Sequence, residues 1–259
     1  MGTVWVHPES PSKTAWRLPP EGDLTLDSGA LHVWHASLNL HPEQCAVLAQ
    51  TLAPEELERA ERLRIPGKRH QFIAARAVLR TILARYVGRA PNALSFCYGP
   101  QGKPAITAPA PPIQFNLSHA EDLALCAVAR QAKVGIDLER IDPQRPILDI
   151  ARRFFSPNEA RDLEALPETQ RVDAFYRCWT CKEAYLKARG RGLHLPLDSF
   201  DVVVHPDRAA GLKAVAKNPA EAEKWAISTL PVDPGYAAAC ALSPPLKDWR
   251  FWKWTPGPT

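Results

Sequence analysis

The sequence has no long apolar run. No window approaches the about 18 consecutive apolar residues that a membrane-spanning helix needs. An N-terminal basic segment followed by an apolar core, which is the pattern of a secretory signal, is also missing. We therefore expect a protein that is neither exported nor inserted into a membrane.

The cysteines do not form the pattern of a small secreted protein. The chain has 6 cysteines in 259 residues, whereas disulfide frameworks belong to short chains with regular spacing. Cys178 and Cys181 form a C-x-x-C, but no second pair at zinc spacing and no redox turn accompanies it. We expect reduced, chemically passive thiols and a cytoplasmic location.

A strong charge of either sign is missing too. The 32 Lys and Arg residues against 28 Asp and Glu give a net charge of +4, which favours acidic partners without requiring nucleic acid. Aromatic residues near the C-terminus, such as Trp252 and Trp254, could stack on bases. Packing of a terminal strand explains them more simply, and we expect no nucleic-acid partner.

Apolar periodicity and turn residues predict a mixed fold of helices and short strands. We expect helices at 54–61, 69–86, 148–155 and 171–189, the third being followed by a helix start at Ser156-Pro157-Asn158-Glu159. We expect strands at 31–38, 93–98, 114–117, 123–129, 200–205, 224–229 and 237–242. Residues 123–138 are expected to form a hairpin that turns at 130–133.

One candidate strand carries two carboxylates. In V-G-I-D-L-E-R, which begins at Val134, apolar residues alternate with Gly135, Asp137 and Glu139. Because alternate side chains of a strand share a face, Asp137 and Glu139 should lie together. Neighbouring carboxylates repel each other, so a bound cation would explain the pair, and hard oxygen ligands favour Mg²⁺ or Mn²⁺.

The helix expected at 171–189 carries a third carboxylate. The stretch W-T-C-K-E-A-Y-L-K, which begins at Trp179, places Glu183 among Lys182 and Lys187. A metal with two ammonium groups beside it suits a pyrophosphate better than a carboxylate substrate.

Simpler interpretations of these two motifs remain open. D-x-E often marks the solvated face of a strand, and K-E-x-x-x-K is a common solvated helix pattern. A Mg²⁺-dependent phosphodiesterase or nuclease would use the same residue types. A noncatalytic module that binds coenzyme A or nucleic acid would need no metal.

The chain is long enough for two packed halves. A diverged duplication and chance similarity are the two explanations for the motifs that the halves share. Ala77–Arg80 in one helix resembles Ala184–Lys187 in the other, and each helix precedes a Ser-Phe pair. This register would place Arg76 opposite Glu183. The halves are expected at 1–130 and 131–259, with a ligand between them.

Together, several motifs resemble the Sfp-type 4′-phosphopantetheinyl transferases. The resemblance runs from about Pro54 to Leu242 and depends on the order and spacing of F-N-L-S-H-A at Phe115, V-G-I-D-L-E-R at Val134, R-R-F-F-S at Arg152, W-T-C-K-E-A-Y-L-K at Trp179 and P-L-D-S-F at Pro196. It implies an α/β (α+β) fold of two similar subdomains related by pseudo-twofold symmetry. Each would be a small sheet packed on a long helix, with the active site in the cleft between them.

The resemblance also implies an activity. The enzyme would transfer the 4′-phosphopantetheine moiety of coenzyme A to a serine hydroxyl of an apo acyl or peptidyl carrier protein and release 3′,5′-ADP. The first half would bind coenzyme A and the carrier, and the second half would hold Mg²⁺. We expect a monomer, because both halves of the site belong to one chain.

Site residues follow from the same resemblance. The implied metal ligands are Asp137, Glu139 and Glu183, and the implied catalytic residues are Glu183, Lys187 and Asp137. The implied residues for coenzyme A are Arg69, Arg76, Lys103, Pro104, Ser118, His119, Lys182 and Lys187. His119 would face the 3′-phosphate, although a capped loop histidine is the plain alternative.

Overall fold

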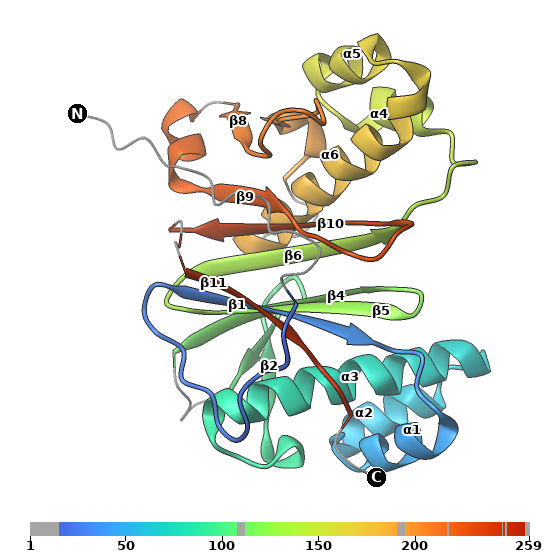
Figure 1. Ribbon diagram of the computed structural model, residues 1–259, viewed down its shortest axis with the longest axis vertical. Coiled ribbons are helices and arrows are strands. Elements are labelled where there is room, and N and C mark those ends of the chain that lie inside the picture. Colours follow the sequence, from blue (N-terminus) through green and yellow to red (C-terminus); the bar gives the residue numbers. More distant parts are fainter. Residues whose placement is uncertain are drawn as a thin grey trace. The chain divides into compact units, whose positions relative to one another are not determined.

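The protein divides into two units, each with its own sheet and its own long helix (Figure 1). The computed structural model describes residues 16–107, 112–190, 195–216, 218–244, 246 and 248–256. The first unit comprises residues 16–131 and the C-terminal segment from Trp249, and the second unit runs from Ala132 to Asp248. The C-terminal segment thus groups with the first unit, whereas the sequence assigned it to the second half.

The first unit is a four-stranded sheet packed on helices. Its strand order is β11-β1-β5-β4, with β1 at Ala30–Ser37, β4 at Ile113–Ala120, β5 at Leu123–Arg130 and β11 at Asp248–Lys253. The helices are α1 (Pro42–Ala49), α2 (Pro54–Glu61) and α3 (Pro66–Val87), and β2 (Phe96–Tyr98) pairs with β3 (Pro104–Ile106) after the short helix η1 (Pro91–Ala93). Val78 and Leu79 of α3 share an apolar core with Trp34 of β1 and Val128 of β5.

The second unit is a three-stranded sheet packed on α6. Its strand order is β6-β10-β9, with β6 at Lys133–Arg140, β9 at Ala226–Thr229 and β10 at Tyr236–Ser243. After β6 the chain forms helices α4 (Ile147–Phe154), α5 (Pro157–Ala165) and α6 (Glu168–Arg189). The short helix η3 (Leu197–Ser199) then leads into the paired strands β7 (Phe200–Val202) and β8 (Leu212–Val215), and η4 (Pro219–Lys224) precedes β9. The mixed α+β fold predicted from the sequence is confirmed.

The predicted hairpin over residues 123–138 is wrong. β5 pairs with β1 along one edge and with β4 along the other. β6 instead pairs with β10, where Asp137 lies opposite Ala239. Because both edges of β5 are already hydrogen-bonded, β5 has no edge left for β6.

Both units contain the same buried ion-pair arrangement, which supports a duplication. In the first unit, Glu56 of α2 binds Arg80 of α3, and Arg80 donates to the carbonyls of Pro91 and Leu94. In the second unit, Glu159 of α5 binds Lys182 of α6, and Lys182 donates to the carbonyls of Leu197 and Phe200.

The helix ends set the register of this repeat. Arg80 and Lys182 stand at the same distance before Gly88 and Gly190, the left-handed glycines that end α3 and α6. Arg80 therefore corresponds to Lys182, and the predicted correspondence of Arg76 with Glu183 is wrong. The pseudo-twofold relation between the units stays a prediction.

Among the described helices, none combines the length and apolar character needed to cross a bilayer.

Candidate active site

Gly135 allows α6 to lie directly on β6. A Cβ atom at Gly135 would overlap the backbone of Ala184 and Ala188, which are one turn apart on α6. Because side chains alternate along a strand, Asp137 and Glu139 share the face of Gly135 and also point toward α6. The glycine thus places both carboxylates of β6 against the helix that carries Glu183 and Lys187.

We expect Gly135→Ala to destabilise the second unit by about 1–3 kcal/mol, because the added methyl group must push α6 away from β6. Urea denaturation followed by circular dichroism would measure the change. Gly29→Ala is the matched control, since a Cβ atom there meets no atom within 4 Å. Equal midpoints for the two variants would show that the close approach is not needed.

Asp137 is buried and paired with a lysine. Its Oδ1 atom accepts a hydrogen bond from Lys187 Nζ at 2.5 Å. The Asp137 side chain is 4% exposed and that of Lys187 is 31% exposed. The ammonium group therefore neutralises a buried carboxylate from the solvent side of the pair.

Glu139 and Glu183 are electrostatically coupled to Asp137. Burial raises the pKa of Glu183, and the charges of Asp137 and Glu139 raise it further, while Lys187 opposes them. Burial and the charge of Asp137 likewise raise the pKa of Glu139, against the charge of Arg145. The negative charge of Asp137 thus makes ionisation of Glu139 and Glu183 harder, even with Lys187 present.

These three carboxylates with Lys187 form what we call the carboxylate cluster. As placed, no three His, Cys, Asp or Glu side chains within the described residues form a group that could hold a metal ion. Lys187 stands against Asp137 in the position of a counter-ion. The donor types nonetheless fit Mg²⁺, which binds carboxylate oxygens and leaves other positions to water or phosphate.

Lys182 does not belong to the cluster, which corrects the sequence prediction that it binds phosphate. Its side chain is fully buried, with Nζ 2.7 Å from Glu159 Oε2 and 2.6 Å from the carbonyl oxygen of Phe200. A third bond of 2.7 Å goes to the carbonyl of Leu197, so all three ammonium protons have acceptors. Lys182 and Glu183 are neighbours in the motif, but Lys182 is bonded inside the second unit whereas Glu183 belongs to the carboxylate cluster.

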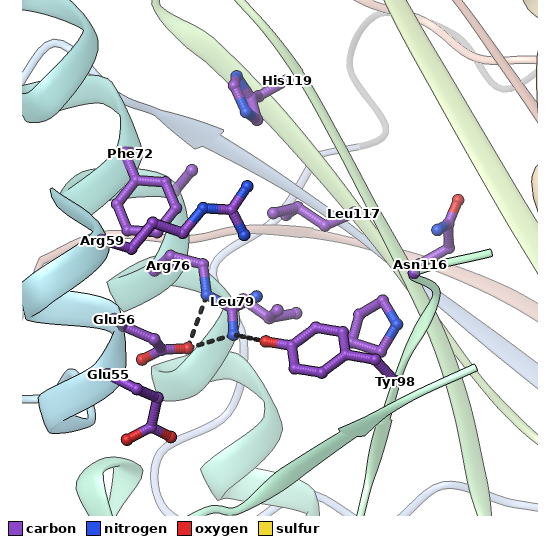
Figure 2. Close-up of a pocket in the computed structure, with 13 residues that line it drawn as sticks. Glu55, Glu56, Arg59, Phe72, Arg76, Leu79, Tyr98, Asn116, Leu117 and His119 are labelled. Atoms are coloured by element: carbon purple, nitrogen blue, oxygen red, sulfur yellow. Dashed lines mark hydrogen bonds and ion pairs between the residues drawn. The ribbon is translucent and has the colours of Figure 1, made fainter. Parts of the chain in front are cut away.

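The first unit contains a cavity of about 480 Å³ whose lining combines charged side chains with apolar ones (Figure 2). Its walls come from α2, α3, β2, the turn before β3 together with the first residue of β3, and β4. The lining residues are Glu55, Glu56, Arg59, Phe72, Ala75, Arg76, Leu79, Tyr98, Gly102, Pro104, Asn116, Leu117 and His119. The cavity combines three basic side chains with aromatic rings, which suits an anionic ligand with a planar group.

Three of the residues predicted to bind coenzyme A meet at this cavity: Arg76, Pro104 and His119. Arg69 is exposed on α3, and neither it nor Lys103 is among the lining residues. Ser118 is buried and, by strand alternation, lies on the opposite face of β4 from His119. The structure therefore places only part of the predicted coenzyme A set at this cavity.

The sequence prediction missed the other lining residues, among them Glu56, Arg59, Phe72 and Tyr98. Arg59 lies over the ring of Phe72, 5.3 Å from its centroid, and reaches into the space between Phe72 and Leu117 (Figure 2). The helical spacing of Phe72, Arg76 and Leu79 on one stripe of α3 could have pointed to this set.

Comparison with known proteins identifies the family. The model of the 4'-phosphopantetheinyl transferase superfamily matches residues 133–241. The chain is 38% identical over 237 residues to the 4'-phosphopantetheinyl transferase HetI of Nostoc sp., covering 91% of this chain and 97% of the relative. The chain belongs to the 4′-phosphopantetheinyl transferase superfamily. It is thus an enzyme of the class predicted from its motifs.

Other members of the superfamily are similar over most of their length. The 4'-phosphopantetheinyl transferase Sfp of Bacillus subtilis is 34% identical over 194 residues, covering 74% of this chain and 83% of the relative. Among solved structures, holo-[acyl-carrier-protein] synthase of Thermotoga maritima matches with a TM-score of 0.36 and 21% identity, over 43% of this chain and 62% of that chain. An ACPS–CoA complex of Chronobacterium ammoniagenes matches with a TM-score of 0.34 and 22% identity, over 44% of this chain and 96% of that chain.

The superfamily match covers the carboxylate cluster. Residues 133–241 run from the start of β6 into β10 and include all of α6. The cavity of the first unit lies outside that range. In this phosphopantetheinyl transferase the cavity must therefore be assigned from its own geometry and charge.

Proposed function

We propose that the protein transfers 4′-phosphopantetheine from coenzyme A to a serine of an apo acyl or peptidyl carrier protein and releases 3′,5′-ADP. The serine oxygen would form a new bond to the β-phosphorus of coenzyme A, and the bond from that phosphorus to the oxygen of the leaving 3′,5′-ADP would break. The observation that carries this proposal is the carboxylate cluster with Lys187, in a member of the superfamily.

Within the cluster, we assign Asp137, Glu139 and Glu183 as the residues that would hold Mg²⁺ (or Mn²⁺). When bound, the metal would supply positive charge for the pyrophosphate oxygens. Lys187 is partly exposed beside Asp137, so its ammonium group would meet phosphate oxygens from the solvent side of the cluster. It would then stabilise the negative charge of 3′,5′-ADP as this group leaves.

The serine needs a base, because a hydroxyl is a weak nucleophile at its own pKa. Glu183 is the candidate for this role, either directly or through a water molecule. It stands on α6, one turn before Lys187, so the same helix would present the base and the cation to the reacting groups.

The cavity of the first unit is suited to the nucleotide end of coenzyme A. Arg59, Arg76 and His119 would bind phosphate oxygens, and the rings of Phe72 and Tyr98 offer apolar walls for the adenine. The carrier protein would dock near exposed basic residues, namely Arg64 between α2 and α3 and Lys68 and Arg69 of α3, because carriers of this kind are acidic around their serine. We propose a cytoplasmic monomer with these partners.

Intact-mass analysis of an apo acyl carrier protein tests this function. We expect the carrier to gain one phosphopantetheine mass when incubated with the protein, coenzyme A and Mg²⁺, and to stay unchanged with a chelator. An unchanged carrier across acyl and peptidyl types would refute the transfer. Release of free phosphopantetheine without carrier modification would indicate a phosphodiesterase instead.

A further inference from the structure

Glu56 joins two arginines at the edge of the cavity. Its Oε1 atom accepts from Arg76 Nε at 2.8 Å and also from Arg76 Nη2, and its Oε2 atom accepts from Arg80 Nε at 2.6 Å. The backbone N–H of Ala53 donates to Oε2 at 3.0 Å. The Glu56 side chain is only 6% exposed, so these bonds are shielded from water.

The two arginines differ in their access to the cavity. Arg80 is 1% exposed, and its Nη1 atom donates to the carbonyls of Pro91 and Leu94 at 2.8 and 2.9 Å. Arg76 is 13% exposed and lines the cavity, where its Nη2 atom also donates to the hydroxyl of Tyr98 at 3.3 Å (Figure 2). Glu56 thus has one guanidinium fixed in the interior and holds the other at the cavity wall.

This arrangement leaves positive charge at the wall. One carboxylate serves two guanidinium groups, so the three side chains together carry a net positive charge. Burial raises the pKa of Glu56, but the hydrogen bonds and charges of Arg80 and Arg76 outweigh burial and hold the pKa below its usual value. Glu56 is therefore ionised at neutral pH and stays hydrogen-bonded to Arg76. Its single negative charge does not cancel the attraction of the two guanidinium groups for an anion.

We propose that Glu56 is a positioning residue that aims the guanidinium of Arg76 at a phosphate group bound in the cavity. The proposal rests on the assignment of this cavity to the nucleotide end of coenzyme A. An arginine side chain loses conformational entropy when it binds a phosphate, and a guanidinium already held on a carboxylate loses less. Arg80 acts through Glu56 in turn, since it fixes the second carboxylate oxygen.

A positioning role and a purely electrostatic role for Glu56 predict opposite changes in ligand affinity when Glu56 is neutralised. Removing a negative charge beside an anion site should tighten binding if only charge matters. If Glu56 holds Arg76 in place, the same change should weaken binding, because Arg76 is then free to turn away. Glu55 provides the matched control, since it precedes Glu56, lines the same cavity and is exposed.

The test measures affinity for 3′,5′-ADP by isothermal titration calorimetry in the full chain. We expect Glu56→Gln to weaken binding about tenfold, as expected for losing a hydrogen bond to a charged group, and Glu55→Gln to tighten it slightly. Arg76→Met should weaken binding at least as much. The double variant should match Arg76→Met alone, because Glu56 then has nothing left to position.

Transfer kinetics supply a second measurement. Glu56→Gln should raise the KM for coenzyme A about tenfold and change kcat by less than about twofold. Glu56→Asp keeps the charge for Arg80 but shortens the side chain, so it should also weaken binding and remains informative if Glu56→Gln fails to fold.

Three outcomes would overturn the proposal: unchanged or tighter binding in Glu56→Gln, additive effects in the double variant, or normal binding in Glu56→Asp. If the wild-type protein transfers phosphopantetheine while these results appear, only the positioning role is wrong. If the wild-type protein neither binds 3′,5′-ADP nor modifies a carrier, the proposed function fails with it.

Discussion

Asp137→Asn should lower the rate of phosphopantetheine transfer by about 10²–10³-fold, the loss typical of removing one electrostatic group from an active site. Asp137 is the most buried carboxylate of the cluster and the partner of Lys187. Asparagine keeps the shape of the side chain but removes the charge that would hold both the metal and the lysine. Initial rates of carrier modification at saturating coenzyme A would measure the effect.

Loss of folding should not explain this result. Lys187 is 31% exposed, so water can solvate its ammonium group once Asp137 is neutral. Circular dichroism of the variant should therefore match the wild-type protein. Asp149→Asn on α4 is the control, because its side chain is 77% exposed and its partner Arg152 is also on the surface. Full turnover by Asp137→Asn would remove Asp137 from the active site.

Local patterns predicted most of the elements, because each depends on residues close in the chain. Helix α2 lies at Pro54–Glu61 as predicted, and Ser156 caps α5 by accepting from the backbone N–H of Glu159, as its capping sequence indicated. The face shared by Asp137 and Glu139 followed from strand alternation alone.

Strand pairing and burial could not be predicted in the same way. The hairpin failed because β5 pairs with the preceding strand β4 and with the distant strand β1, while β6 pairs with the distant strand β10. The polar turn at 130–133 is equally compatible with a chain that passes from one sheet to another. Lys182 was misassigned because its buried partner Glu159 lies on another helix. Arg59 was missed because the cavity wall it joins is assembled from five separate segments.

Lys182→Met should destabilise the protein by about 3–5 kcal/mol, the usual cost of breaking a buried ion pair. Glu159 and Lys182 have no exposed surface, so the substitution leaves a carboxylate charge without its counter-ion inside the second unit. The remaining donors to Glu159 include the backbone N–H groups of Ser156 and Val202 and the thiol of Cys178. They carry no net charge and cannot replace the ammonium. Urea denaturation followed by circular dichroism would measure the loss.

A surface pair on the same unit gives the matched control. Lys213 and Asp162 are 3.1 Å apart but 37% and 51% exposed, so Lys213→Met should cost about 0–1 kcal/mol. Adding Glu159→Leu to Lys182→Met should recover part of the stability, because an apolar pair no longer buries an unpaired charge. Equal losses in Lys182→Met and Lys213→Met would mean that the buried pair is not what joins α5, α6 and η3. In that case the accessible, phosphate-binding role predicted for Lys182 would have to be reconsidered, because a lysine that can leave the interior at little cost can also reach a ligand.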